Sequence, residues 1–140
     1  MSVYVDSSFV VSLYLTDVHS SEARRRVQGA TPPILTPLHR AEWCHALAQH
    51  QFRGTVTAEK AQRTNAQFAS DKAANLWRNA PLPENAFELC ADLARYYGPK
   101  LGMRTLDTLH VACALEFKAE RFWTFDERQA KLAKAQGMKI

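Results

Sequence analysis

Short apolar runs alternate along this chain with longer segments of helical periodicity, and this alternation restricts the possible folds more than any other feature. The runs at Val3–Val5 ("VYV") and Arg121–Phe125 ("RFWTF") have the β-branched and aromatic residues of buried strands. A shorter strand is expected within "PPILTP", and "MKI" is a candidate edge strand. Strands separated by helices pair in parallel, because a helical crossover returns the chain to the same end of the sheet. We therefore predict an α/β fold, a three-layer α/β/α arrangement around a central parallel sheet of about four or five strands.

The helical segments are bounded by caps and glycines. Either Ser7 or Ser8 can cap the first of them, Gly54 ends the third, and Thr57 can cap the fourth. On these signals helices are expected at about 7–17, 20–29, 38–54, 57–77, 83–98, 104–115 and 127–137.

Two of these helices have apolar stripes that should face the core. The stripe of the fourth helix is narrow, so much of that helix should be exposed. The stripe residues are Leu38, Trp43, Leu47 and Phe52 in the third helix, and Ala61, Phe68, Ala73 and Leu76 in the fourth.

Length and cysteine usage predict a single cytoplasmic domain. A chain of 140 residues suits one domain over residues 1–140, with no need for a disulfide or structural metal. Cys44, Cys90 and Cys113 each lie in an apolar helical pattern and are expected to be reduced core residues. No run of apolar residues approaches the roughly 20 of a membrane span, and no signal peptide is recognisable.

Four carboxylates lie where this fold gathers functional groups. Asp6 and Asp126 end strands, while Glu42 and Asp107 lie in the first turns of helices. Because strand C-termini and helix N-termini share one side of a doubly wound sheet, these acids are expected to converge. Two carboxylates ~4 Å apart repel by roughly 4 kcal/mol, so a cation is expected among them, and oxygen ligands favour Mg²⁺ or Mn²⁺. Such an ion can activate water against a phosphodiester.

The overall charge is compatible with a polyanionic substrate. The chain has 18 basic and 14 acidic residues, a formal net charge of +4. If the four acids above form a metal pocket, the remaining surface is more basic still. An acidic pocket within a basic surface suits nucleic acid, because the surface binds phosphates while the pocket performs the chemistry.

Each of the four acids also has a simpler structural explanation. Asp6 and Asp126 each precede a helix and can cap it. Glu42 and Asp107 can be first-turn acids that the helix dipole favours. The residues alone leave both interpretations open.

Four motifs in this sequence resemble those of the PIN-domain ribonucleases, specifically the VapC-type toxins of bacterial toxin–antitoxin pairs. They occur in that family's order and at its approximate spacing, and they span nearly the whole chain. The motifs are "VYVDSSFVVSLYL", "TPLHRAEWCHAL", "RTLDTLHVACAL" and "FWTFDERQAKLAKAQGMKI".

The resemblance implies an endoribonuclease toxin that depends on Mg²⁺ or Mn²⁺. Asp6 and Asp107 match the firmest metal ligands, Glu42 would complete the site, and Asp126 matches a more variable fourth acid. Ser8 matches a hydroxyl residue that supports the site by hydrogen bonding. The family further implies an RNA substrate, a cognate VapB-like antitoxin and a homodimer.

Two other functions remain open at this stage. One is a non-catalytic PIN-like module that binds RNA or protein. The other is a phosphatase of the haloacid-dehalogenase type, which needs a second aspartate two residues after Asp6, where this chain has Ser8. We also expect Arg104 to contact either the scissile phosphate or a nearby carboxylate. His110, one turn after Asp107, can support the site through another residue, but such a histidine is more often satisfied within the helix packing.

Overall fold

Four short parallel strands form the centre of the molecule. The computed structural model describes all 140 residues. The strands are β1 (Val3–Val5), β2 (Ile34–Leu35), β3 (Arg78–Asn79) and β4 (Arg121–Trp123), in the order β3-β2-β1-β4. In the register of the sheet, Tyr4 of β1 lies opposite Ile34 on one side and Phe122 on the other. The predicted α/β fold with a central parallel sheet is confirmed.

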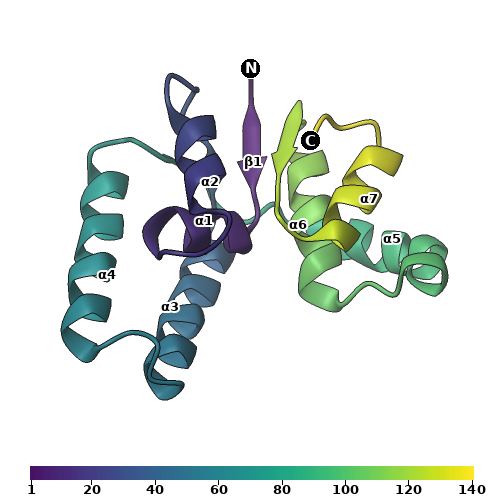
Figure 1. Ribbon diagram of the computed structural model, residues 1–140. Helices are drawn as coiled ribbons and strands as arrows, with labels where there is room; N and C mark the ends of the chain where they lie inside the picture. The colour runs from purple at the N-terminus through teal and green to yellow at the C-terminus, as the bar shows by residue number, and fades with distance from the viewer.

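Seven helices cover the two faces of this sheet. Figure 1 shows α1 to α4 on one side of β1 and α5 to α7 on the other, with β1 between them. None of the helices is long and apolar enough to cross a membrane. Their bounds are α1 (Ser7–Tyr14), α2 (Ser20–Val27), α3 (Pro37–Phe52), α4 (Ala58–Ala73), α5 (Ala86–Leu101), α6 (Thr105–Glu116) and α7 (Glu127–Ala135).

The alternation of side chains along the strands creates two separate cores. Tyr4 and Phe122 point to one face, where they pack with residues of α5, α6 and α7. Val3, Val5 and Trp123 point to the other, where they pack with residues of α1 to α4. Successive side chains of a strand face opposite sides of the sheet, so both faces must be covered to bury these strands.

The fourth helix is shorter than predicted, and the strand that follows it in the chain, β3, was not predicted. α4 ends at Ala73 rather than near Trp77, and Asn75 takes a left-handed conformation with φ of 60°. The chain then turns to place β3 beside β2, where Arg78 N–H donates to Pro33 O at 2.8 Å. β3 is two polar, exposed residues at the edge of the sheet, so it has no apolar pattern to reveal it.

Several local predictions are wrong at helix ends. Phe52 is 88% exposed in the last turn of α3, Leu76 lies outside α4 and is 57% exposed, and Ala73 is exposed. Cys44 is exposed rather than buried. Phe52, Ala73 and Leu76 follow the apolar spacing but lie at or beyond the ends of their helices, whereas Cys44 is an exposed position within α3, next to the buried Trp43.

Other element boundaries also differ from the sequence-based expectation. The first helix begins at Ser7 and Asp6 is its N-cap, so neither serine caps it. α5 begins at Ala86, continues through Gly98 and Pro99, and ends at Leu101, followed by the C-cap Gly102 with a φ of 65°. The expected strand at "MKI" is a single bridge that pairs Lys139 with Arg121.

A buried histidine fixes the start of α3 against the sheet. His39 Nδ1 accepts from Thr36 N–H at 2.9 Å, and its Nε2–H donates to Val5 O at 2.6 Å. Both ring nitrogens are therefore used in the neutral form, with the proton on Nε2. Burial, and after it the neighbouring His110, lower the pKa of His39 from 6.5 to about 3.

The shift at His39 predicts acid sensitivity of the fold. Between these two pKa values the unfolded chain binds a proton at residue 39 that the folded protein does not bind. Stability therefore falls as pH falls through this window, by about 1.4 kcal/mol per pH unit in its lower part. The free energy of unfolding in urea, measured from about pH 7 to about pH 4, should fall less steeply for His39→Gln than for the wild type.

His45→Gln is the matched control, because His45 lies on the same helix but is exposed. It should keep the wild-type slope. Equal slopes for the wild type and His39→Gln would contradict the prediction.

Candidate active site

Asp6 is a buried carboxylate at the point where β1 passes into α1. It is 1% exposed, and it caps α1 by accepting from Phe9 N–H at 3.0 Å. The hydroxyl of Ser8 lies 2.8 Å from both carboxylate oxygens, and Thr124 Oγ1 donates to Oδ2 at 2.8 Å. Burial raises the pKa of Asp6, although His110 and these hydrogen bonds oppose the rise. The Asp6 side chain thus both caps α1 and lies at the centre of a polar cluster.

A chain of hydrogen bonds connects Asp6 to two further acids. Thr124, which donates to Asp6, also accepts from Asp126 N–H at 2.9 Å. Asp126 caps α7 by accepting from Gln129 N–H at 2.9 Å, and the Gln129 side-chain amide donates to Asp107 Oδ1 at 3.0 Å. Residues from β1, α6 and the β4–α7 junction are therefore joined in one polar network.

Asp107 occupies the first turn of α6, as predicted, and it is 5% exposed. Its Oδ2 accepts from Arg104 Nε at 3.2 Å, so the expected carboxylate contact of Arg104 is present. The Arg104 side chain is 75% exposed, whereas that of Asp107 is 7% exposed. One partner of this ion pair can therefore move into solvent while the other remains fixed.

Glu42 belongs to a second network that includes a histidine. Its Oε1 accepts from Ser7 Oγ at 2.7 Å and from His110 Nε2. The other ring nitrogen of His110 lies 2.8 Å from the Tyr4 hydroxyl. Burial would raise the pKa of Glu42, but the hydrogen bonds from His110 and Ser7 outweigh it and leave the pKa lowered. Glu42 is therefore held as a carboxylate whose direction is fixed by buried neighbours.

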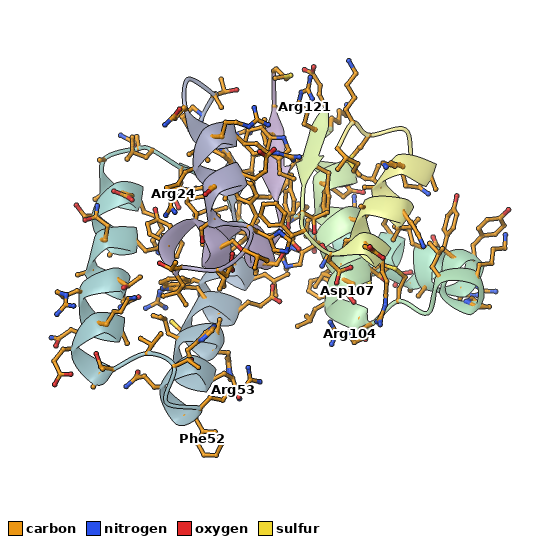
Figure 2. The ribbon with its side chains drawn as sticks, in the orientation of Figure 1. Arg24, Phe52, Arg53, Arg104, Asp107 and Arg121 are labelled. Carbon is orange, nitrogen blue, oxygen red and sulfur yellow. The ribbon has the colours of Figure 1, made fainter.

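A hollow of about 680 Å³ lies over these networks. Glu42 and Asp126 line it with Ser7 and Ser8, whereas Asp6 and Asp107 are buried and contact it only through Ser8 and Arg104. Figure 2 shows Arg53 at the C-terminal end of α3 and Arg104 beside Asp107, and both arginines also line the hollow. It therefore combines carboxylates with cations that can bind phosphate.

The structure decides how the predicted acids are arranged. Asp6, Asp107 and Asp126 belong to one network beneath this hollow and Glu42 to a second, and Asp6 and Asp126 are helix caps as well. No three Asp, Glu, His or Cys side chains are arranged so that they could hold one metal ion together. Asp6 and Asp107 instead accept hydrogen bonds from Ser8, Thr124, Gln129 and Arg104. That the four acids together hold one ion stays a prediction.

Sequence reasoning missed two residues of the site. His110, which holds Glu42, had been considered for a supporting role beside its more common role in the packing. Gln129 and Arg53 were not considered. The signals were available, because Gln129 follows Asp126 by three residues and Arg53 follows Glu42 by eleven, which places each pair on one side of its helix.

Comparison with known proteins identifies the family. The model of the PIN domain family matches residues 3–135. The chain belongs to the PIN domain family. The resemblance inferred from the four motifs is thereby confirmed at the level of the family.

Two individual proteins are similar over nearly the whole chain. Ribonuclease VapC46 of Mycobacterium tuberculosis (strain ATCC 25618 / H37Rv) is 27% identical over 141 residues, which cover 99% of this chain and 95% of the relative. The crystal structure of Mycobacterium tuberculosis VapC20, described as a sarcin-ricin loop cleaving toxin, superposes with a TM-score of 0.69 at 14% identity. It covers 93% of this chain and 94% of that chain, and at this identity it supports the PIN fold alone.

The network around Asp6 predicts a stability effect at Thr124. Thr124→Val keeps the shape of the side chain but removes the hydroxyl that serves both Asp6 and Asp126. A buried carboxylate oxygen then loses a donor, so the free energy of unfolding in urea should fall by about 2 kcal/mol at neutral pH.

Thr124→Ser keeps the hydroxyl and should lose much less stability. In an Asp6→Asn background the valine substitution should also cost less, because a neutral amide needs that donor less than a carboxylate does. The same loss in both backgrounds would show that Thr124 does not act through Asp6.

Proposed function

We propose that this protein is a metal-dependent endoribonuclease and the toxin of a toxin–antitoxin pair. Membership of the PIN domain family supports the assignment, as does similarity to a ribonuclease named VapC46. The observation that carries it is the buried Asp6 carboxylate, which makes no ion pair and is joined by hydrogen bonds to Asp126 and Asp107. A fold stabilised by apolar packing alone has no need of this arrangement, because an unpaired buried charge is costly.

The donor set fits a divalent ion such as Mg²⁺ or Mn²⁺. All candidate ligands are carboxylate oxygens, and Mg²⁺ typically takes one or two carboxylates while keeping several waters. We assign Asp6 and Asp107 as the residues that hold the ion, with Glu42 and Asp126 completing the site directly or through water. When bound, the ion supplies a water activated for attack on phosphorus and polarises the phosphoryl oxygen.

The remaining polar residues have roles that follow from their contacts. Ser8 and Thr124 fix the orientation of the Asp6 carboxylate. Glu42, held by His110 and kept ionised, is placed to accept a proton at its carboxylate. Arg53 and Arg104 line the same hollow and would contact phosphates of the substrate. These two arginines provide binding, while the acids provide the chemistry.

The substrate and partners follow from the same reasoning. The surplus of basic residues suits RNA, and a toxin of this type requires an antitoxin of the VapB kind. A second hollow of about 390 Å³, lined by Leu13, Tyr14, Val27 and Trp77, offers apolar surface for a partner segment. We further propose that the protein is a homodimer. We also propose a cytoplasmic location, because the cysteines are free, as is usual in a reducing compartment.

The first test is cleavage of RNA by the purified protein with Mg²⁺. Asp6→Asn and Asp107→Asn each remove a proposed ligand, so the rate of cleavage should fall by about a hundredfold or more. Product formation from a labelled RNA on a denaturing gel measures this rate.

Asp92→Asn is the matched control, because Asp92 is an exposed acid on α5, outside the site networks. It should cleave as the wild type does. If the protein binds RNA but never cleaves it, the alternative of a non-catalytic binding module is favoured. Equal cleavage by the wild type and both site variants would exclude the proposed chemistry.

Metal binding can be tested without activity. A divalent ion that binds only the folded protein raises its melting temperature, and the rise grows with the metal concentration. Millimolar Mg²⁺ near neutral pH should therefore raise the melting temperature of the wild type. Asp6→Asn should abolish the rise, and Asp92→Asn should keep it. No shift in the wild type would count against a metal site.

A further inference from the structure

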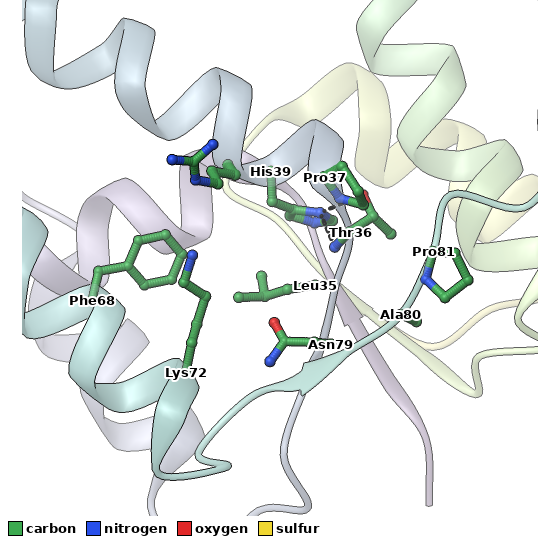
Figure 3. A pocket seen from close by; sticks show the side chains of 10 residues that line it. Leu35, Thr36, Pro37, His39, Phe68, Lys72, Asn79, Ala80 and Pro81 are labelled. Carbon is green, nitrogen blue, oxygen red and sulfur yellow. Dashed lines mark hydrogen bonds between the residues drawn. The ribbon is translucent and has the colours of Figure 1, made fainter.

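A separate hollow of about 390 Å³ lies beyond the C-terminal ends of β2 and β3. Figure 3 shows Lys72 and Phe68 of α4 facing Leu35 and Asn79 across it, with the start of α3 above. Arg40 of α3 also lines this hollow. Residues two apart on a helix point to different flanks, so Arg40 faces α4 whereas Glu42 faces the acid site.

The two cations of this hollow have no acidic partner. No carboxylate lines the cavity, and neither Arg40 nor Lys72 makes an ion pair. Burial lowers the pKa of Lys72, and the positive charge of Arg40 lowers it further. Arg40 is exposed and Lys72 is half-buried, so the two like charges lie at the open hollow, and an anion placed between them would relieve their repulsion.

The other walls suit an anion that carries a larger organic group. Lys72 Nζ lies 4.6 Å from the centre of the Phe68 ring, which holds the ammonium at the wall of the cavity. Leu35 and Pro81 provide apolar surface, and Asn79 provides an amide. A phosphate with an attached sugar would use all of these features.

The hollow and the acid site both lie at the C-terminal ends of the parallel strands. Asp6 follows β1, while the hollow lies at the ends of β2 and β3 in the order β3-β2-β1-β4. Adjacent strands are about 4.8 Å apart, so roughly 10 Å separates the end of β3 from the end of β1. A single RNA strand that reaches the acid site can extend over these strand ends.

We propose that Arg40 and Lys72 bind a phosphate group of the RNA strand, at a subsite on the opposite flank of α3 from the acid cluster. This inference rests on the proposed ribonuclease function and adds a second point of contact with the substrate. The subsite contributes to binding, and the acids alone contribute to the chemistry.

The test is binding of a labelled single-stranded oligoribonucleotide in the presence of EDTA, so that no cleavage occurs. Lys72→Gln removes one phosphate contact, so affinity should fall by about fivefold at about 0.1 M salt, and the slope of log affinity against log salt should become shallower by about 0.7. Arg40→Gln should behave alike. Lys72→Arg keeps the charge and should retain most of the affinity.

Lys100→Gln is the matched control. Lys100 also lies over an aromatic ring near a helix C-terminus, with Nζ 3.8 Å from the centre of Tyr96, but it is outside the hollow. The Lys100→Gln substitution removes the same charge, and it should leave the affinity for RNA and the slope of log affinity against log salt unchanged. Equal losses for Lys72→Gln and Lys100→Gln would overturn the subsite in favour of a diffuse charge effect.

Two further outcomes separate this proposal from the proposed function. If Lys72→Gln and Arg40→Gln weaken RNA binding, Lys100→Gln does not, and the wild type never cleaves RNA with Mg²⁺, the subsite stands and the nuclease assignment fails. If the wild type cleaves RNA and Lys72→Gln binds and cleaves it with an unchanged KM, the subsite fails and the nuclease assignment stands. Binding of adenosine monophosphate that depends on Lys72, without any effect on RNA binding, would overturn the assignment to RNA.

Discussion

The burial of one carboxylate, that of Asp6, is the constraint on which the rest of the site depends. A buried acid needs donors for its oxygens, and these come from the first turn of α1 and from the end of β4. Meeting this need fixes the start of α1 relative to β1 and holds β4 beside it. The same arrangement leaves Asp6 buried without a basic partner, which is the condition that favours a bound cation.

The polar networks show that structural and functional explanations of these acids are compatible. Asp6 and Asp126 cap helices and also belong to the site, because the N-terminus of a helix lies where a parallel strand ends. Asp107 accepts from Arg104, an exposed side chain that can leave it. The proposed metal and the observed ion pair would therefore compete for one carboxylate, and the cost of exposing Arg104 to water is small.

The helix α3 separates two kinds of surface. One flank carries Glu42 toward the acid site, where His110 and Ser7 hold it. The other carries Arg40 toward Lys72 and a hollow without acids. His39, the residue before Arg40, is buried and anchors the helix to β1. A rigid helix thereby keeps a chemical site and a candidate binding site at a fixed separation along one edge of the sheet.

The sequence by itself determined the parallel α/β fold, because alternating apolar strands and amphipathic helices leave few other ways to bury both faces of a sheet. It also identified the strand-end and first-turn acids as candidates, since these positions follow from local pattern. Only the tertiary structure decided that Gln129 connects Asp126 to Asp107, that His110 holds Glu42, that β3 exists, and that Arg40 lies near Lys72. Such contacts join residues far apart in the chain, and their geometry depends on how the helices pack rather than on any local periodicity.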